Sequence, residues 1–245
     1  MALPASCLGG EVGLVEQALQ GAGKLVAWMV DLQLGQSTGV LRVLCLGAHS
    51  DDIEIGCGGT ILRLLAQRHD VEVRWVVFAA SPARRLEGER SAEMFLRKAV
   101  KKEIVVRDFK ESFFPYIGSE IKEYFEELKR MISPDVVVTH FRDDLHQDHR
   151  LISELTWNTF RDHLILEYEI IKYDGGLGSP NLFVHLSEEV CAEKIKYLME
   201  NFQSQRSHQW FTEDTFRAML RLRGVESNAP SKFAEAYYAR KLVLS

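Results

Sequence analysis

Short runs of valine, isoleucine and leucine alternate with longer amphipathic segments between residues 42 and 161. The apolar runs have the length of strands, and the segments between them have the helical spacing of apolar residues. The predicted elements, in order, are strand 42–47, helix 60–68, strand 71–78, helix 88–100, strand 103–107, helix 120–131, strand 135–140 and helix 150–161. Continuously apolar strands separated by helices are typical of a parallel sheet covered on both faces. We therefore predict an α/β fold with a doubly wound, mostly parallel sheet.

The pattern becomes less regular after residue 162. The predicted elements there are strand 164–173, a glycine-rich loop at 175–180, strand 181–186, helix 187–202, helix 212–222 and strand 232–244. Strand 232–244 is expected at the sheet edge, although residues 234–239 also suit a helix. Because no internal repeat or low-complexity linker divides the chain, residues 40–245 are expected to form one domain with a C-terminal elaboration.

Residues 1–39 are expected to form an N-terminal extension ahead of this domain. The stretch 14–34 is apolar, but Glu16, Lys24 and Asp31 interrupt it, and no basic segment precedes it. It therefore lacks the features of a membrane-spanning helix and of a secretory signal. Several glycines punctuate the extension, which we interpret as loosely helical.

Composition restricts the class of protein. Hydrophobic residues make up 46% and charged residues 27% of the 245, as in a globular domain that can bury a large core. The formal charge of −5 gives no electrostatic reason to expect nucleic acid or an anionic membrane as a partner. The cysteines form no CxxC pair and suit reduced thiols in a cytoplasmic protein; they are Cys7, Cys45, Cys57 and Cys191.

Two polar clusters follow two of the predicted strands. They are His49-Ser50-Asp51-Asp52 and His146-Gln147-Asp148-His149. The carboxyl ends of parallel strands form the ligand crevice of such a sheet, so both clusters can converge on one small volume. Imidazoles and carboxylates gathered there indicate a hydrolytic metal site.

The first cluster offers two adjacent carboxylates for two roles. If one of Asp51 and Asp52 binds a metal, the other can face the water that the metal activates. The following glycines, in the segment 56–60, allow a tight turn into the next helix. A phosphate cradle is disfavoured because acidic residues would surround the phosphate and the GxGxxG spacing is absent. A purely structural role, in which the acids cap a helix, remains the alternative.

The second cluster favours the metal site. His146 and His149 are three positions apart at the start of a helix, so both can point into the crevice. Asp143, Asp144 and Asp148 can cap this helix and orient an imidazole through its second nitrogen. Two histidines and one aspartate with an open position are typical of catalytic zinc, and the same ligands also suit Fe²⁺ or another divalent metal.

These clusters resemble the two signatures of the PIG-L / LmbE-like family of metal-dependent N-acetylglucosaminyl deacetylases. The matching segments are Ala48-His49-Ser50-Asp51-Asp52, Gly56-Cys57-Gly58-Gly59-Thr60 and His146-Gln147-Asp148-His149. The match reaches from about residue 42 to the C-terminus. It implies a Rossmann-like fold and removal of the N-acetyl group from an N-acetylglucosamine-type sugar or conjugate, with release of acetate and a free amine. Homo-oligomerisation is left open.

The resemblance also implies roles for individual residues. It implies that zinc is bound by His49, Asp52 and His149, that Asp51 is the general base, and that His146 is a supporting histidine. As a cation near the metal, His146 would stabilise the oxyanion. The arginine of Arg90-Ser91-Ala92-Glu93 resembles one that holds the sugar in some members. Separately, the segment Lys172-Tyr173-Asp174-Gly175 follows a predicted strand and could reach the crevice. Asp174 is therefore a candidate substrate contact, with a plain loop as the favoured alternative.

Two positions depart from the family pattern. Ser50 stands where the first motif usually has proline, which removes backbone rigidity but no ligand. Asp144 stands where some mycothiol-pathway members have a tyrosine that helps to stabilise the oxyanion. Because an anion cannot do so, another donor or His146 has to supply this stabilisation.

Two other functions remain as alternatives. A different metal-dependent amidase or a phosphoesterase would use the same site, although a phosphate substrate usually requires more Arg or Lys than these loops provide. A catalytically silent sugar-binding module would not need Asp51 beside a complete ligand set.

Deletion of residues 1–39 is predicted to leave a folded, active domain, because the strand pattern begins only near Val40. Thermal unfolding and acetate release of the truncated and full-length proteins test this. Loss of cooperative unfolding would show that the extension packs into the core.

Overall fold

The computed structural model describes residues 39–243, so nearly all of the predicted N-terminal extension, residues 1–39, lies outside the described residues. The strands are β1 (Leu41–His49), β2 (Val71–Ala79), β3 (Lys101–Val106), β4 (Val136–His140), β5 (Leu164–Tyr168), β6 (Leu182–Leu186) and β7 (Phe233–Ala239). The helices are α2 (Asp52–Gln67), α3 (Pro82–Phe95), α4 (Gly118–Met131), α5 (Gln147–Thr159), α6 (Glu188–Asn201) and α7 (Glu213–Glu226), with short 3₁₀ turns η1 (Phe114–Tyr116) and η2 (Gln203–Gln205).

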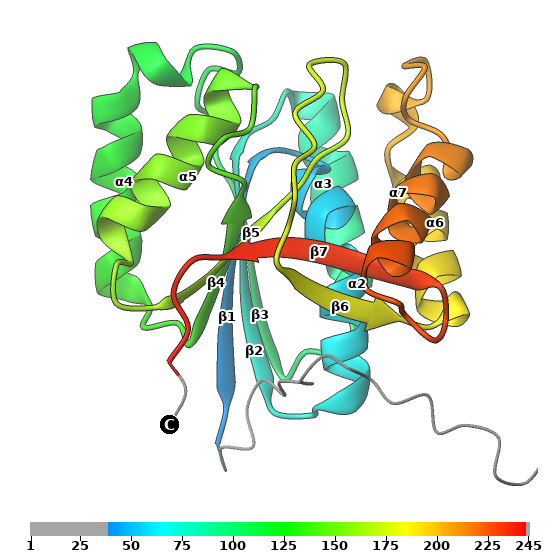
Figure 1. Ribbon diagram of the computed structural model, residues 1–245. Helices are drawn as coiled ribbons and strands as arrows, with labels where there is room; N and C mark the ends of the chain where they lie inside the picture. Colours follow the sequence, from blue (N-terminus) through cyan, green and yellow to red (C-terminus); the bar gives the residue numbers. More distant parts are fainter. Residues whose placement is uncertain (1–38, 244–245) are drawn as a thin grey trace, which may run out of the picture. The chain divides into compact units, whose positions relative to one another are not determined.

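The seven strands form one mixed sheet in the order β3-β2-β1-β4-β5-β7-β6 (Figure 1). The strands β1 to β5 pair in parallel, whereas β7 runs antiparallel to both β5 and β6. The predicted α/β class with a mostly parallel sheet is confirmed. After β1 the chain adds strands on one side as far as β3 and then crosses to β4 on the other side. The switch point of the sheet therefore lies between β1 and β4.

Helices cover both faces of the sheet, as predicted (Figure 1). Side chains alternate along β1, so Val43 and Cys45 join one hydrophobic core while Leu44 and Leu46 join the other. The core around Val43 is closed by α2, α3, α6 and α7, and the core around Leu44 is closed by α4 and α5. Both surfaces of β1 are therefore buried, which explains its continuously apolar sequence.

The glycine-rich segment 56–60 was predicted to turn into a helix beginning near Thr60, and this prediction is wrong. The helix α2 begins at Asp52 and includes these glycines. Glycine lowers helix propensity, but here three glycines let other side chains approach the helix closely. A Cβ at Gly56, Gly58 or Gly59 would lie within 3 Å of another side chain. Tertiary packing therefore overrides the local preference.

Three further boundaries differ from the predictions. The helix predicted at 88–100 is α3, which begins at Pro82, because Ser81 caps it by accepting a hydrogen bond from the Arg84 N–H at 3.4 Å. The strand predicted at 164–173 ends at Tyr168. The last strand, β7, lies between β5 and β6, so β6 and not β7 forms the edge of the sheet. Within residues 39–243, every helix is too short or too polar to cross a membrane.

The substitution Gly56→Ala is predicted to destabilise the protein. The new Cβ would lie 2.1 Å from Cδ2 of the fully buried Tyr168 ring. Overpacking of this kind lowers the free energy of unfolding by about 1–3 kcal/mol. Gly118→Ala in α4 is the control, because its Cβ would meet only Leu151, at 3.8 Å. Equal unfolding temperatures for both variants would contradict the close packing at Gly56.

Candidate metal centre

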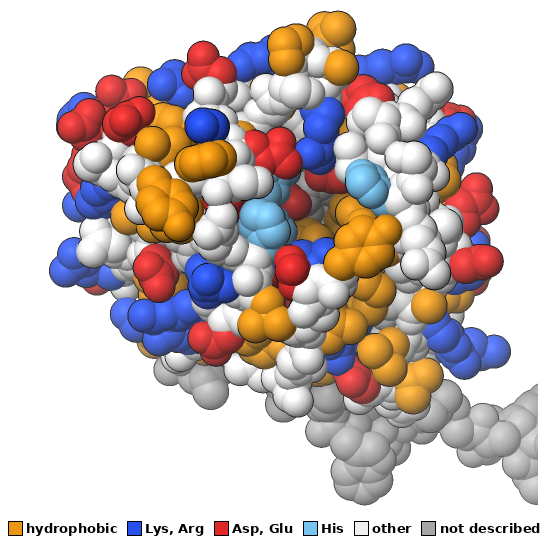
Figure 2. Space-filling model, turned by 90° about the horizontal axis from the view of Figure 1, so that it is seen from above, with side chains coloured by type: hydrophobic (Ala, Val, Ile, Leu, Met, Phe, Trp, Pro, Cys, Tyr) orange, Lys and Arg blue, Asp and Glu red, His pale blue; other side chains and the backbone are white. Residues whose placement is uncertain are grey.

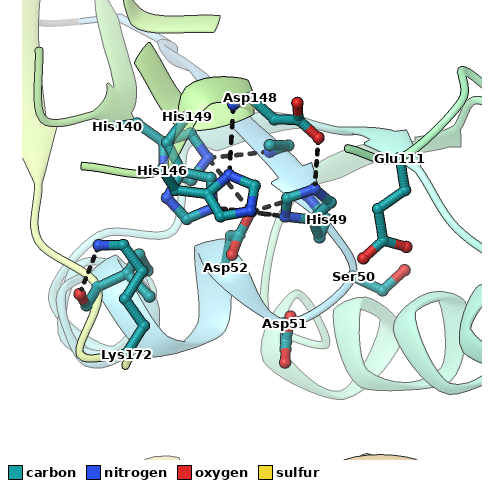
Figure 3. A network of polar contacts seen from close by, with 12 residues as sticks. His49, Ser50, Asp51, Asp52, Glu111, His140, His146, Asp148, His149 and Lys172 are labelled. Atoms are coloured by element: carbon teal, nitrogen blue, oxygen red, sulfur yellow. Dashed lines mark hydrogen bonds and ion pairs between the residues drawn. The ribbon is translucent and has the colours of Figure 1, made fainter. Parts of the chain in front are cut away.

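The two polar clusters meet at the switch point of the sheet. His49 is the last residue of β1, Asp52 is the first residue of α2, and His149 lies in the first turn of α5. All three side chains are buried and lie side by side in Figure 3. Histidines also lie in a hollow between acidic and hydrophobic side chains on the face seen in Figure 2. The fold thus joins residues 100 positions apart, as the sequence predicted.

Three atoms in this cluster form a nearly equilateral triangle. His49 Nδ1 lies 3.5 Å from Asp52 Oδ2, Asp52 Oδ2 lies 3.6 Å from His149 Nε2, and His149 Nε2 lies 3.3 Å from His49 Nδ1. A tetrahedral zinc with bonds of about 2.0–2.2 Å has edges of about 3.3–3.6 Å between its ligand atoms. The residues present therefore fit a tetrahedral metal with one face formed by the protein and one position open.

Each imidazole of the triangle is held from its outer side by a carboxylate. Asp148 Oδ2 lies 3.1 Å from His49 Nε2, and Asp144 Oδ2 lies 3.1 Å from His149 Nδ1. A carboxylate at the remote nitrogen fixes the ring and leaves the other nitrogen available for a metal. Asp144, the departure from the family pattern, thus orients His149.

The two outer carboxylates are themselves anchored. Asp148 accepts hydrogen bonds from the Ser112 N–H at 2.6 Å and the Phe114 N–H at 3.3 Å. Asp144 accepts one from the His146 N–H at 2.7 Å and one from Lys172 Nζ at 2.8 Å. The segment after β5 therefore reaches the cluster through Lys172.

Burial and neighbouring charges set the protonation of the metal-free triangle. Burial alone would lower the pKa of His49, but Asp148 and Asp52 outweigh it and raise this pKa to about 10. Burial and the nearby His140 lower the pKa of His149 to about 3. Burial would raise the pKa of Asp52, but the surrounding His149 and His140 hold it well below its usual range. A metal binding at neutral pH would therefore displace a proton from His49.

Asp51 lies beside the triangle in a strained backbone conformation. Its φ of 129° is rare for any residue except glycine. The Asp51 Oδ1 atom accepts a hydrogen bond from Arg84 Nη2 at 2.7 Å, and the same Nη2 donates to the Ser50 carbonyl at 2.7 Å. Burial raises the pKa of Asp51 to about 7, although the Arg84 charge opposes this rise. A carboxyl group with this pKa can accept a proton near neutral pH.

His146 caps α5 and lies at the open side of the cluster. Its Nδ1 accepts a hydrogen bond from the Asp148 N–H at 3.3 Å, and its ring centroid lies 5.1 Å from that of His49 and 4.5 Å from that of His149. Burial and the charge of His49 lower the pKa of His146. This direction favours the neutral form of His146 in the metal-free protein, and the protonated role expected from sequence stays a prediction. Because Nδ1 accepts a hydrogen bond, the neutral ring carries its proton on Nε2.

The two predicted substrate contacts, Arg90 and Asp174, are both exposed. Arg90 is exposed on α3, and helical geometry places it about 120° around that helix from Arg84, which does reach the cluster. Asp174 is exposed in the loop after β5, and its charge acts on His146. Arg84 could have been found from its position in the first turn after β2.

His140 is a second residue that the sequence analysis missed. It is fully buried at the end of β4, its Nε2 lies 3.2 Å from Asp52 Oδ2, and it accepts a hydrogen bond from the Ala48 N–H at 2.9 Å. Its ring stacks on that of His149 at 3.9 Å. The signal was its place at the carboxyl end of a predicted strand.

Comparisons with known proteins relate the chain to one family and to several solved structures. Residues 44–160 match the family model described as PIG-L: GlcNAc-PI de-N-acetylase. The conserved protein TT1542 from Thermus thermophilus has a similar structure, with a TM-score of 0.67 and 17% identity over 84% of this chain and 97% of that chain. GalB, the 4-carboxy-2-hydroxymuconate hydratase from Pseudomonas putida KT2440, has a TM-score of 0.66 and 15% identity over 84% of this chain and 98% of that chain. The N,N'-diacetylchitobiose deacetylase from Pyrococcus horikoshii has a TM-score of 0.57 and 21% identity over 80% of this chain and 82% of that chain. At these identities the structural likeness shows the shared fold.

The substitution His149→Ala is predicted to abolish tight metal binding, because it removes one vertex of the triangle. Wild-type protein purified without chelator should carry one divalent ion per chain, most of it zinc. Elemental analysis of the two proteins checks this, with His163→Ala, a histidine outside the cluster, as the control. Full metal occupancy in His149→Ala would show that this ligand assignment is wrong.

Proposed function

Residues 44–160 of this chain form a PIG-L family domain, and from this premise we propose that the protein is a zinc-dependent hydrolase. It removes the N-acetyl group from an N-acetylglucosamine-type sugar or sugar conjugate and releases acetate and a free amine. The observation that carries the proposal is the buried triangle of His49, Asp52 and His149 with the separate carboxyl group of Asp51 beside it. Pure ligand binding does not require a proton acceptor at that place.

The proposed metal is held by His49 Nδ1, Asp52 Oδ2 and His149 Nε2. When bound, a divalent metal would polarise the amide carbonyl and lower the pKa of a water molecule. Zinc is proposed over Fe²⁺ because two imidazoles and a carboxylate in tetrahedral array are typical of catalytic zinc sites.

Asp51 is the proposed general base. Its pKa of about 7 matches the pH at which a base combines a deprotonated state with sufficient basicity. It accepts a proton from the attacking water and returns it to the nitrogen as the C–N bond breaks, so that acetic acid and a neutral amine leave. The remaining water proton stays on the product's carboxyl group and passes to the amine or to solvent, which gives acetate. Arg84 holds the carboxylate in place and also keeps its pKa from rising further.

His146 is the proposed donor to the developing oxyanion. Because its Nδ1 accepts the Asp148 N–H, the neutral ring carries its proton on Nε2 and can donate from there. Neutral His146 is the form proposed here, and the protonated form expected from sequence remains the alternative. Asp144 contacts His149 and Lys172 and, as an anion, cannot stabilise the oxyanion. We therefore assign this stabilisation to His146.

A panel of substrates tests the proposed function. Purified protein is incubated with N-acetylglucosamine, an N-acetylated disaccharide, a nucleotide-linked N-acetylglucosamine and a phosphate monoester, and acetate, free amine and phosphate are measured. We expect equal amounts of acetate and amine from at least one acetylated sugar, and none after chelation of the metal. Phosphate release without acetate would favour a phosphoesterase. Tight sugar binding without any product would favour a silent binding module.

The adjacent carboxylates are predicted to fail differently when substituted. Asp51→Asn preserves the shape and removes the base, so metal content should stay near the wild-type level while turnover falls by roughly two or more orders of magnitude. Asp52→Asn should weaken metal binding, and added zinc should partly restore activity. Metal stoichiometry and turnover are measured for both variants with and without excess zinc. An Asp51→Asn protein that is metal-free, or that turns over at the wild-type rate, would refute the assignment of the base.

The substitution Arg84→Met is predicted to shift the pH dependence of turnover. Activity should rise with pH as Asp51 loses its proton, and the guanidinium lowers the pKa of that group. Without the cation, the acid limb of kcat/KM should move to higher pH by about 1–3 units, the usual effect of an adjacent opposite charge. Arg85→Met is the control, because Arg85 pairs with Glu89 on the outer side of α3. An unchanged acid limb in Arg84→Met would exclude this coupling.

A further inference from the structure

A buried ion pair enters the backbone of α2. Four residues apart in α2, the Gly59 N–H and the Ile55 carbonyl are the two members of one helical hydrogen-bond position. Here Lys194 Nζ donates to the Ile55 carbonyl at 2.6 Å, and Glu235 Oε1 accepts from the Gly59 N–H at 2.7 Å. Lys194 and Glu235 also pair with each other at 2.6 Å. The ion pair therefore bridges both members of one helical hydrogen bond.

Glu235 also contacts the next backbone N–H of the helix and a tyrosine hydroxyl. Its Oε2 accepts a hydrogen bond from the Thr60 N–H at 2.7 Å and from the Tyr237 hydroxyl at 3.0 Å. A Cβ at Gly59 would lie 2.8 Å from Glu235 Oε1 and 2.5 Å from Leu186. The glycine is therefore required for the carboxylate to reach the backbone.

Stability alone does not account for two charges at this place. Lys194 and Glu235 are each only 3% exposed. A buried ion pair offsets little more than its own desolvation cost, and apolar residues of similar volume are often as stabilising. Such a pair can instead fix the position of the helix relative to the elements that carry Lys194 and Glu235.

The part of α2 that the pair holds is the turn that carries the site. The Ile55 N–H donates to the Asp51 carbonyl at 2.9 Å, so Lys194 and Asp51 hold opposite ends of the same residue. On the other side of the turn, Gly56 packs against the Tyr168 ring, whose hydroxyl donates to the Leu46 carbonyl at 2.7 Å. A displacement of Ile55 would therefore move Asp51 and Asp52 relative to His49 and His149.

We propose that Lys194 and Glu235 are positioning residues of the metal centre, which set the place of the first turn of α2 and with it the distance of Asp52 from the two histidines. This inference rests on the ligand set given for the proposed function. Without the pair, the Ile55 carbonyl and the Gly59 N–H lose these side-chain contacts, the first turn of α2 shifts, and the triangle loses its tetrahedral edge lengths.

The test uses the full-length double variant Lys194→Met/Glu235→Leu, in which no buried charge is left unpaired. Zinc affinity is measured by competition with a chromophoric chelator, and the ligand geometry is read from the visible absorption of the Co²⁺-substituted protein. We expect zinc affinity to fall by about 10–100-fold, as for other residues that orient metal ligands, with an altered Co²⁺ spectrum and cooperative thermal unfolding. A folded double variant with wild-type affinity and spectrum would overturn the proposal.

A second variant and a matched control complete the test. Glu235→Gln keeps the volume and one acceptor oxygen, so its affinity should fall in the same direction by a smaller factor, and an unchanged affinity counts against the proposal. Arg63→Met removes another tether of the same helix, the 2.7 Å hydrogen bond to the His185 carbonyl, and should lower the unfolding temperature without changing zinc affinity. If Arg63→Met lost as much zinc affinity as the double variant, the ion pair would only stabilise α2 in general, which would overturn the proposal. Wild-type protein that binds no divalent metal would overturn the proposed function together with this inference. A wild-type protein that binds zinc and a double variant with unchanged affinity would overturn the inference alone, so the two failures are distinguishable.

Discussion

The parallel pairing of β1 with β4 is the constraint on which the site depends. Cys45 of β1 lies opposite Val138 of β4, and both strands then continue to a histidine, His49 in one and His140 in the other. Because the chain reverses its direction of strand addition between these two strands, the helices that follow diverge and leave a crevice at their carboxyl ends. His149 enters the same crevice from α5. The buried sheet thus holds in contact polar groups that would otherwise repel one another or remain hydrated.

These buried polar groups are stable there because each one is hydrogen-bonded or paired with a neighbour that is itself anchored. The central triangle is oriented by Asp144 and Asp148, and these carboxylates are in turn held by backbone N–H groups and Lys172. Asp51, with its strained φ, places a second carboxyl group against Arg84. Two neighbouring aspartates therefore occupy different electrostatic environments, which gives them pKa values on opposite sides of the usual one. This separation of pKa values is typical of sites that combine a metal ligand with a base.

Much of the fold was predictable from sequence because it depends on local periodicity. The strands near residues 42, 71 and 135, and the convergence of the two clusters, follow from apolar runs and the rules of parallel sheets. The start of α2 was not predictable, since the close contacts of Gly56, Gly58 and Gly59 with Tyr168, Phe95 and Glu235 exist only in the folded protein. Arg84 and His140 also escaped notice, because their importance depends on which neighbours the fold gives them. Arg90, carried over from a motif, is exposed, whereas Arg84 of the same helix reaches Asp51.

Anomalous X-ray diffraction from crystals of the zinc-loaded protein at the zinc edge tests the central claim most directly. The account predicts one strong peak within about 2.0–2.2 Å of His49 Nδ1, Asp52 Oδ2 and His149 Nε2. Two other groups among residues 39–243 could also hold a metal, namely His49 with His146 and Asp148, and His140 with Asp144 and His149. A peak in either of these groups, or no peak in the crevice at full zinc loading, would contradict the assignment of the metal centre.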